Sequence, residues 1–144
     1  MTHFVKIAAN GKPAKANAKR HAAAIDTRTG LMWSAADACA PATLSAATEA
    51  CEKLQLAGFT DWRLPTFEEL VLLADRSRYN PAIDTDAFPT CKGGWYRTST
   101  PAASSPSGFA WGVYFLNGSA YCGHQNSPGR VRAVRSVSAP AAGQ

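Results

Sequence analysis

The segment Gly58–Leu70 (GFTDWRLPTFEEL) constrains the fold more than any other part of the chain. It opens with a glycine that can take a positive φ and end a preceding helix. Asp61 and Arg63 flank a tryptophan, an arrangement that favours pairing of the two charges with each other or with backbone. Thr66 followed by Glu69 is the pattern of a capping box, in which each side chain accepts a hydrogen bond from the other residue's backbone amide. The segment therefore predicts a rigid structural joint with a helix starting at Thr66.

Composition sets the class of protein. The chain has 144 residues, of which 46% are hydrophobic and 17% charged, which is typical of one globular domain with one core. No apolar run approaches the roughly 18 residues that a bilayer-spanning helix needs. The first residues lack the apolar stretch of a signal peptide. We therefore expect a protein that stays in the cytoplasm where it is made, or leaves by a route such as cell lysis.

The net charge of +5 belongs to the N-terminal part of the chain. Residues 1–28 hold six basic residues and one acid, whereas the remainder holds nine of each. A basic segment of this kind can dock on an acidic surface. It can equally be an ordinary solvated stretch, and the sequence leaves both interpretations open.

The four cysteines lie at positions 39, 51, 91 and 122. None of their spacings is Cys-x-x-Cys, which argues against a zinc ribbon or a thioredoxin-type site. Cys51 falls in a helical apolar pattern and is interpreted as a small core residue. Cys91 and Cys122 fall in loop-rich regions, and whether they form a disulfide is left open.

Hydrophobic periodicity predicts an α+β protein in which strands come first, two helices follow, and strands return after a long irregular region at residues 79–110. An early hairpin should turn at Gly30, and a second hairpin at Asn117-Gly118. The expected helices span residues 44–56 and 66–75. The expected strands are Phe4–Ile7, His21–Asp26, Leu31–Ser34, Trp95–Ser99, Trp111–Phe115, Ser119–Cys122 and a single final strand, Arg130–Arg135.

These elements contain short sequence motifs whose residues and order resemble those of a known family. The matching motifs are Asp26–Trp33 (DTRTGLMW), Ala57–Thr66 (AGFTDWRLPT) with Glu69-Leu70, Asn80–Asp84 (NPAID) with Phe88-Pro89, Thr98–Thr100 (TST), Trp111–Phe115 (WGVYF) with Asn117-Gly118, and Val131–Arg135 (VRAVR). They cover nearly the whole chain. They resemble the C-terminal domain of collagen-like bacterial adhesins (the Lcl C-terminal domain), which also occurs as small phage-encoded proteins.

The resemblance implies a C-type-lectin-like fold: a twisted antiparallel sheet, two helices, and a long irregular loop region that presents a binding surface. It also implies binding roles, which for the bacterial adhesins include attachment to glycans or sulfated polymers. The expected organisation is a basic N-terminal arm with a short strand at residues 1–24, the lectin-like domain at 25–136, and a flexible tail at 137–144.

The sequence gives little support to the hypothesis that the protein is an enzyme. The three histidines are scattered, and neither a Gly-x-Ser-x-Gly elbow nor a glycine-rich phosphate loop is present. Formylglycine-generating enzymes share a related fold, but the residues around Cys91 and Cys122 do not match theirs. Asp84 and Asp86 are the only carboxylates near the long loops, too few for calcium. We therefore expect no enzyme activity, no cofactor and no metal.

Two groups of residues are assigned roles. The segment 121–130 combines an aromatic ring, amides, a histidine and an arginine, a mixture that suits recognition of polar or anionic groups, although it also fits an ordinary polar hairpin loop. The predicted ligand-binding residues are Trp95, Tyr96, Tyr121, His124, Asn126 and Arg130. The predicted structural residues are Trp33, Asp61, Trp62, Arg63, Thr66, Glu69 and Trp111, with Arg132 or Arg135 expected to pair with Asp61 or with acids of the first helix.

The sequence thus favours a non-enzymatic binding or structural module. The expected setting is a phage virion, as an accessory, decoration or host-attachment protein made in the host cytoplasm. The alternatives are a bacterial glycan-binding adhesin domain, in the cytoplasm or at the cell surface, and, more distantly, a formylglycine-generating-type enzyme. Expected partners are virion or cell-surface proteins and glycans or sulfated polymers, with no nucleic acid and no membrane insertion; a homo-oligomer is left open.

Overall fold

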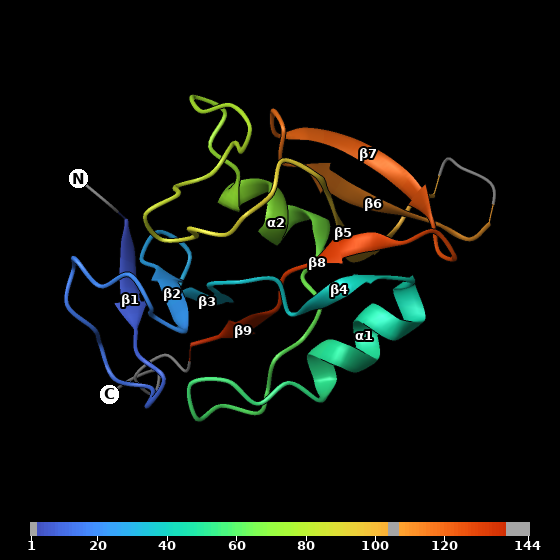
Figure 1. Ribbon diagram of the computed structural model, residues 1–144. Helices are drawn as coiled ribbons and strands as arrows, with labels where there is room; N and C mark the ends of the chain where they lie inside the picture. Colours follow the sequence, from blue (N-terminus) through green and yellow to red (C-terminus); the bar gives the residue numbers. More distant parts are fainter. Residues whose placement is uncertain (1–2, 104–106, 138–144) are drawn as a thin grey trace, which may run out of the picture.

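The structure is a computed structural model that describes residues 3–103 and 107–137, and in that part it contains two helices and two sheets (Figure 1). The expected α+β class is confirmed. The strands are β1 (Phe4–Ile7), β2 (Ala23–Asp26), β3 (Leu31–Ser34), β4 (Cys39–Ala42), β5 (Trp95–Pro101), β6 (Phe109–Tyr114), β7 (Ser119–His124), β8 (Gly129–Val131) and β9 (Val134–Ser136). The helices are α1 (Leu44–Glu52) and α2 (Phe67–Leu73).

The first sheet has four strands in the order β1-β2-β3-β9, all antiparallel to their neighbours. The predicted hairpin is present, and Gly30 turns it with a φ of 74°, which a side chain would disfavour. Trp33 of β3 is fully buried, as predicted for a core residue. This sheet occupies the left of Figure 1 and ends on the short strand β9.

The second sheet has five strands in the order β4-β8-β5-β6-β7. It differs from the expected antiparallel sheet, because β5 and β8 run parallel. The predicted strand Arg130–Arg135 is also wrong as a single element. Its first part is β8 in this sheet, and its last part is β9 in the four-stranded sheet. The alternation of valine and arginine could not show that the chain changes sheets at Arg132.

The helices cover the second sheet: α1 packs on β4 and β5, and α2 on β5 and β6. Ala47 and Cys51 are the buried residues of α1, and burial raises the pKa of the Cys51 thiol to about 12. The prediction that α1 runs to residue 56 and ends at Gly58 is wrong. The helix ends at Glu52, and Gly58 instead takes its positive φ in the turn that joins Leu56 to Phe59.

The segment that follows, Gly58–Leu70, forms the structural joint that the sequence predicts. The capping box at Thr66 is confirmed: the Thr66 hydroxyl accepts from the Glu69 amide at 3.3 Å, and the Glu69 carboxylate accepts from the Thr66 amide at 3.0 Å. Asp61 and Arg63 do not pair with each other. Arg63 binds Glu69 at 2.7 and 2.8 Å, and Asp61 accepts from Arg135 at 2.6 Å, as expected for one of the two C-terminal arginines.

The joint also closes the edge of the first sheet. The backbone of Arg63 exchanges two hydrogen bonds with Val134 of β9, and Trp62 beside it is 2% exposed in the core. One short segment therefore starts α2, supplies a core ring and pairs with the last strand. The assignment of Trp62, Arg63, Thr66 and Glu69 as structural agrees with these contacts.

Among the described residues, the N-terminal strand packs on the rest of the domain. β1 pairs along its whole length with β2. Lys6 is 5% exposed; its ammonium group donates to the carbonyls of Ala16 and Ala18 and lies 3.0 Å from the carboxylate of Asp86. These contacts hold the following loop against the body. The predicted tail, beyond Val137, lies outside the described residues.

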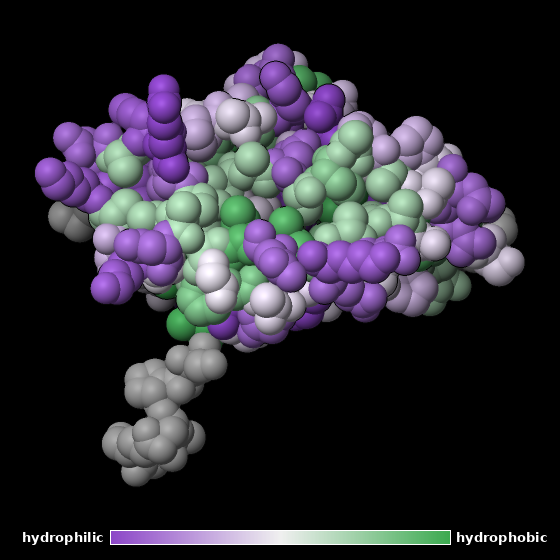
Figure 2. All heavy atoms as spheres, turned by 60° about the horizontal axis from the view of Figure 1, so that its bottom comes forward, coloured by the Kyte–Doolittle hydropathy of each residue, from purple (hydrophilic) through white to green (hydrophobic). Residues whose placement is uncertain are grey.

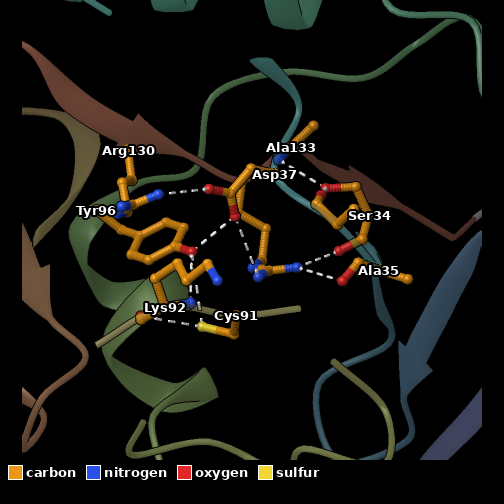
Figure 3. A network of polar contacts seen from close by, with 10 residues as sticks. Ser34, Ala35, Asp37, Cys91, Lys92, Tyr96, Arg130 and Ala133 are labelled. Carbon is orange, nitrogen blue, oxygen red and sulfur yellow. Dashed lines mark hydrogen bonds and ion pairs between the residues drawn. The ribbon is translucent and has the colours of Figure 1, made fainter. Parts of the chain in front are cut away.

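A buried polar network joins the two sheets where the chain passes from β8 to β9 (Figure 3). Arg132 is 1% exposed, and its guanidinium donates to the carbonyls of Ser34 and Ala35 at 2.6 and 3.0 Å. It also lies 3.5 Å from Asp37, which accepts a 2.6 Å hydrogen bond from the Tyr96 hydroxyl. Arg132 therefore links the end of β3, the residues before β4 and the start of β5.

Glu69→Gln tests the joint. The bonds from Arg63 lower the pKa of Glu69 below its usual value, so the stabilisation is present at neutral pH and is lost as the pH falls through the lowered value. At pH 7 the substitution should reduce the free energy of unfolding by about 1 kcal/mol, the order expected for hydrogen bonds to a charged group. The measurement is urea denaturation at pH 7 and at about pH 3, where the difference from the native chain should shrink.

Glu68→Gln is the matched control. Glu68 lies in the same first turn of α2 but is exposed, so its replacement should change stability by only a few tenths of a kcal/mol. Equal losses in the two variants at pH 7 would contradict the role of the Arg63–Glu69 pair.

Candidate functional site: an aromatic hollow on the five-stranded sheet

A shallow hollow of about 300 Å³ opens on the β5–β6–β7 side of the second sheet. Its walls are mainly apolar and carry three aromatic side chains, from three adjacent strands. The lining residues are Trp95, Tyr114, Tyr121, Cys122 and Gly123. Trp95 pairs with Tyr114 in the ladder, and Gly112 pairs with Tyr121, so strand alternation brings the rings to one face.

Glycines make room for Trp95. A Cβ atom built on Gly112 would lie 2.2 Å from the indole, one on Gly123 2.6 Å, and one on Gly129 2.5 Å. These distances are too short for real contacts, so each of the three positions requires the absence of a side chain. The indole therefore lies close against the backbone of β6, β7 and β8, and its place depends on one glycine in each of these three strands.

Two further contacts orient the indole. Its Nε1–H donates to the carbonyl of Tyr121 at 3.2 Å. The guanidinium of Arg97 lies 5.1 Å from the ring centroid, within the range of a cation–π contact. Tyr121 is 54% exposed and packs edge-on against Tyr114 at 5.9 Å. A fixed indole and an accessible phenol thus form one platform.

Arg97 is fully buried, and its contacts support the platform. It donates to the backbone carbonyls of Ala42 and Ser127, which ties β5 to the end of β4 and to the loop before β8. Burial lowers its pKa. Its charge is met by carbonyl dipoles and by the ring of Trp95, and these contacts hold the guanidinium where it supports the platform.

The other face of β5 carries the polar network of Figure 3. Tyr96, next to Trp95, turns away from the hollow and is 0% exposed. Burial is the main cause that raises the pKa of its hydroxyl, which donates to Asp37 and accepts from the Lys92 amide. The expectation that Tyr96 contacts a ligand is therefore corrected: strand alternation places it in the core.

The remaining predicted residues separate into different environments. His124 packs edge-on against Phe109 at 5.2 Å, and its Nδ1 accepts from the Asn126 amide. Arg130 lies 3.5 Å from Asp37 in the polar network. Asn126 lines a neighbouring hollow of about 290 Å³ at the start of α1. Of the six predicted ligand residues, the structure brings Trp95 and Tyr121 together in the aromatic hollow.

The segment 121–130, for which a hairpin loop was one interpretation, consists mostly of strand. β7 continues to His124, and β8 begins at Gly129. Trp111, predicted to be a structural residue, is partly buried, and its ring packs against Phe67 of α2 at 5.6 Å. Tyr114 was missed as a site residue. Strict alternation in Trp111–Tyr114 places Gly112 and Tyr114 on the face opposite Trp111, and this signal could have found it.

The face of the molecule drawn in Figure 2 shows an apolar band across its middle, with hydrophilic side chains towards both ends. A further hollow, of about 210 Å³, has mainly apolar walls of small aliphatic residues: Ala22, Ala35, Ala36, Ala38, Leu54 and Leu56, with His21, Ser34 and Asp37 at its polar positions. It holds no aromatic ring. The hollow at Trp95, in contrast, is lined by three aromatic rings.

Other kinds of site find no support in the described part of the chain. All four cysteines are free thiols, Cys91 and Cys122 included. Within residues 3–103 and 107–137, no three His, Cys, Asp or Glu side chains gather where they could hold a metal ion. Neither described helix is long and apolar enough to cross a membrane.

Comparison with models of known protein families shows to which family the chain belongs. A family model described as the Lcl C-terminal domain matches residues 22–135, most of the chain. The chain belongs to the Lcl C-terminal domain family. It is accordingly an adhesin-related binding module, and the matched range contains the joint, the polar network and the aromatic hollow. A search of curated proteins found no match.

Gly112→Ala tests the floor of the hollow. The new Cβ would overlap the indole of Trp95, so the ring should move outward and its hydrogen bond to Tyr121 should break. We expect tryptophan fluorescence to shift to longer wavelength and the free energy of unfolding to fall by about 1 to 3 kcal/mol, the usual cost of overpacking.

Gly30→Ala is the control. A Cβ on Gly30 meets nothing within 4 Å, although its φ is positive, so this variant should lose stability through backbone strain alone. Its emission spectrum should match that of the native chain. An unchanged spectrum in Gly112→Ala as well would refute the close packing of Trp95.

Proposed function

We propose that this member of the Lcl C-terminal domain family is a non-enzymatic binding module that holds a carbohydrate on the platform of Trp95, Tyr114 and Tyr121. The observation that carries the proposal is the fixed indole beside the accessible ring of Tyr121. Sugar rings present flat faces of C–H groups, which pack on aromatic rings, and hydroxyls, which bind polar groups at the rim of an apolar site.

The rigidity of the platform supports recognition. Trp95 is held by three glycines, by the carbonyl of Tyr121 and by Arg97. A ring that is already fixed loses little conformational entropy when a ligand packs on it, which favours binding. The neighbouring hollow, with Ser45, Gln125 and Asn126, supplies amide and hydroxyl groups that a longer saccharide could reach.

The same features favour binding over catalysis. The aromatic hollow contains no histidine and no carboxylate among its lining residues, so it lacks the usual groups for acid–base chemistry. Its one thiol, Cys122, lies apart from Cys91, whose sulfur is buried beside the Tyr96 hydroxyl at 3.7 Å. The proposal therefore assigns no step of bond making or breaking to this chain.

Tyr121→Ala provides the test, measured on a glycan array and by titration with the saccharides that bind. Tyr121 is 54% exposed and its side chain is replaceable without a cavity. Binding should weaken by tenfold or more, as for an aromatic residue at the centre of a binding surface. Tyr79→Ala is the matched control, because Tyr79 is 72% exposed and lies outside the hollow. Absence of any dose-dependent saccharide binding, or equal loss in both variants, would refute the proposal.

We further propose that the module acts on a phage particle, as an accessory, decoration or host-attachment protein. Four unpaired thiols are consistent with assembly in a reducing cytoplasm. The bacterial adhesin setting is the alternative. Peptide mass spectrometry of purified virions should detect the chain at a fixed ratio to the capsid protein. Its absence from particles, with recovery in a cell-surface fraction, would favour the adhesin setting instead.

A further inference from the structure

The outer edge of the five-stranded sheet is formed by β7, which pairs only with β6 among the described residues. In Figure 1 it forms the upper rim of the sheet. An edge strand presents unpaired N–H and C=O groups that can pair with another strand, and proteins usually protect such edges with charge, proline, bulges or a covering segment. How each sheet edge is protected therefore indicates where this chain can associate.

The other three edges are protected. β1 carries Lys6 and is bridged by the following loop at Ile7 and Pro13. β9 is covered by Arg63, which exchanges two backbone hydrogen bonds with Val134. β4 contains Pro41, pairs with an irregular register and is packed by α1. Each of these devices blocks strand addition.

β7 has none of these devices. Its six residues, Ser119–His124, include no charge and no proline, and its register with β6 is unbroken over six pairs. The wider region is equally neutral: residues 98–129 contain no Asp, Glu, Lys or Arg, although the chain has 25 such residues. Two cations touch the ends of β7: Arg97 donates to the His124 carbonyl at 3.5 Å, and Arg76 binds the Gly118 carbonyl at the start of the hairpin.

We propose that β7 pairs antiparallel with β7 of a second copy of this chain, about a twofold axis. The neutrality of the edge favours a second copy as the occupant, because two chains of net charge +5 repel least where neither carries charge. An axis perpendicular to the sheet would join two five-stranded sheets into one of ten strands. Both aromatic hollows would then lie on the same face.

The geometry also selects a register. Alternate residues of an antiparallel strand direct their N–H and C=O groups to opposite edges. The Tyr121 carbonyl faces inward, where it accepts from the indole of Trp95 on β5, so the backbone groups of Ala120 and Cys122 face the free edge. Placing the axis at Cys122 sets Tyr121 of one copy opposite Gly123 of the other, where no side chain obstructs the ring.

Two experiments test the proposal: chemical cross-linking of the native chain, and sedimentation of variants with a charge on the edge strand. With the axis at Cys122, the two Cys122 side chains lie directly opposite, with Cβ atoms about 5 Å apart. A short bismaleimide should therefore link native chains into a covalent dimer through Cys122. The link should persist in Cys39→Ser, whose thiol lies on β4 at the far edge, and vanish in Cys122→Ser.

Sedimentation velocity on the native chain should show a monomer–dimer equilibrium. Ala120→Lys adds an edge charge at an exposed position of β7 and should raise the dissociation constant at least tenfold. Ala40→Lys is the matched control, since Ala40 is likewise an exposed alanine on an edge strand of the same sheet. A native chain that stays monomeric at every concentration, a dimer that Ala120→Lys leaves unchanged, or cross-linking through Cys39 would overturn the proposal.

Loss of saccharide binding in Tyr121→Ala with an intact dimer, or the reverse, would separate this proposal from the one for the hollow. The two rest on different observations: the hollow on fixed aromatic rings, and the dimer on a neutral, unprotected edge. An extended peptide that binds along β7, while native chains alone remain monomeric, would also count against self-association.

Discussion

The fold depends on the burial of one arginine between two sheets. Arg132 separates β8 from β9, and its guanidinium meets the carbonyls that end β3 and the carboxylate of Asp37 before β4. A buried cation is costly unless carbonyls or a carboxylate compensate it. Here the compensation comes from one segment, residues 34–37 between β3 and β4, which must therefore lie against the passage from β8 to β9. The rings of Phe88 and Tyr96 also pack against the guanidinium, at 4.9 and 5.5 Å, which brings the long region after α2 to the same point.

This junction reaches the candidate site through β5. Tyr96 faces the junction and binds Asp37, whereas Trp95, the residue before it, faces the hollow. Because strand side chains alternate, fixing one face of β5 fixes the other. Arg97 then repeats the arrangement on the side of the hollow, with carbonyls of the β4 end and of the loop before β8 around its guanidinium. The platform is thus positioned by buried polar contacts on both sides of one strand.

Much of the fold could be predicted because the signals are local. The turn at Gly30, the capping box of Thr66 and Glu69, and the buried tryptophans Trp33 and Trp62 follow from short patterns. The division of Arg130–Arg135 between two sheets could not be predicted, since it depends on partners near residue 35. For the site, aromatic character pointed to Trp95 and Tyr121. It also pointed to Tyr96, which the structure buries, and it missed the glycines whose importance appears only when β6, β7 and β8 lie side by side.

The central claim is that binding takes place at Trp95 on the β5–β6–β7 face. The most direct measurement is a two-dimensional ¹H–¹⁵N NMR titration of the native chain with the saccharide that binds best on the array. The account predicts that the indole N–H signal of Trp95 and the amides of Tyr121 and Gly123 shift most, while the indole signals of the buried Trp33 and Trp62 stay in place. Shifts confined to the basic loop around Lys12–Lys19, with an unmoved Trp95 signal, would contradict it.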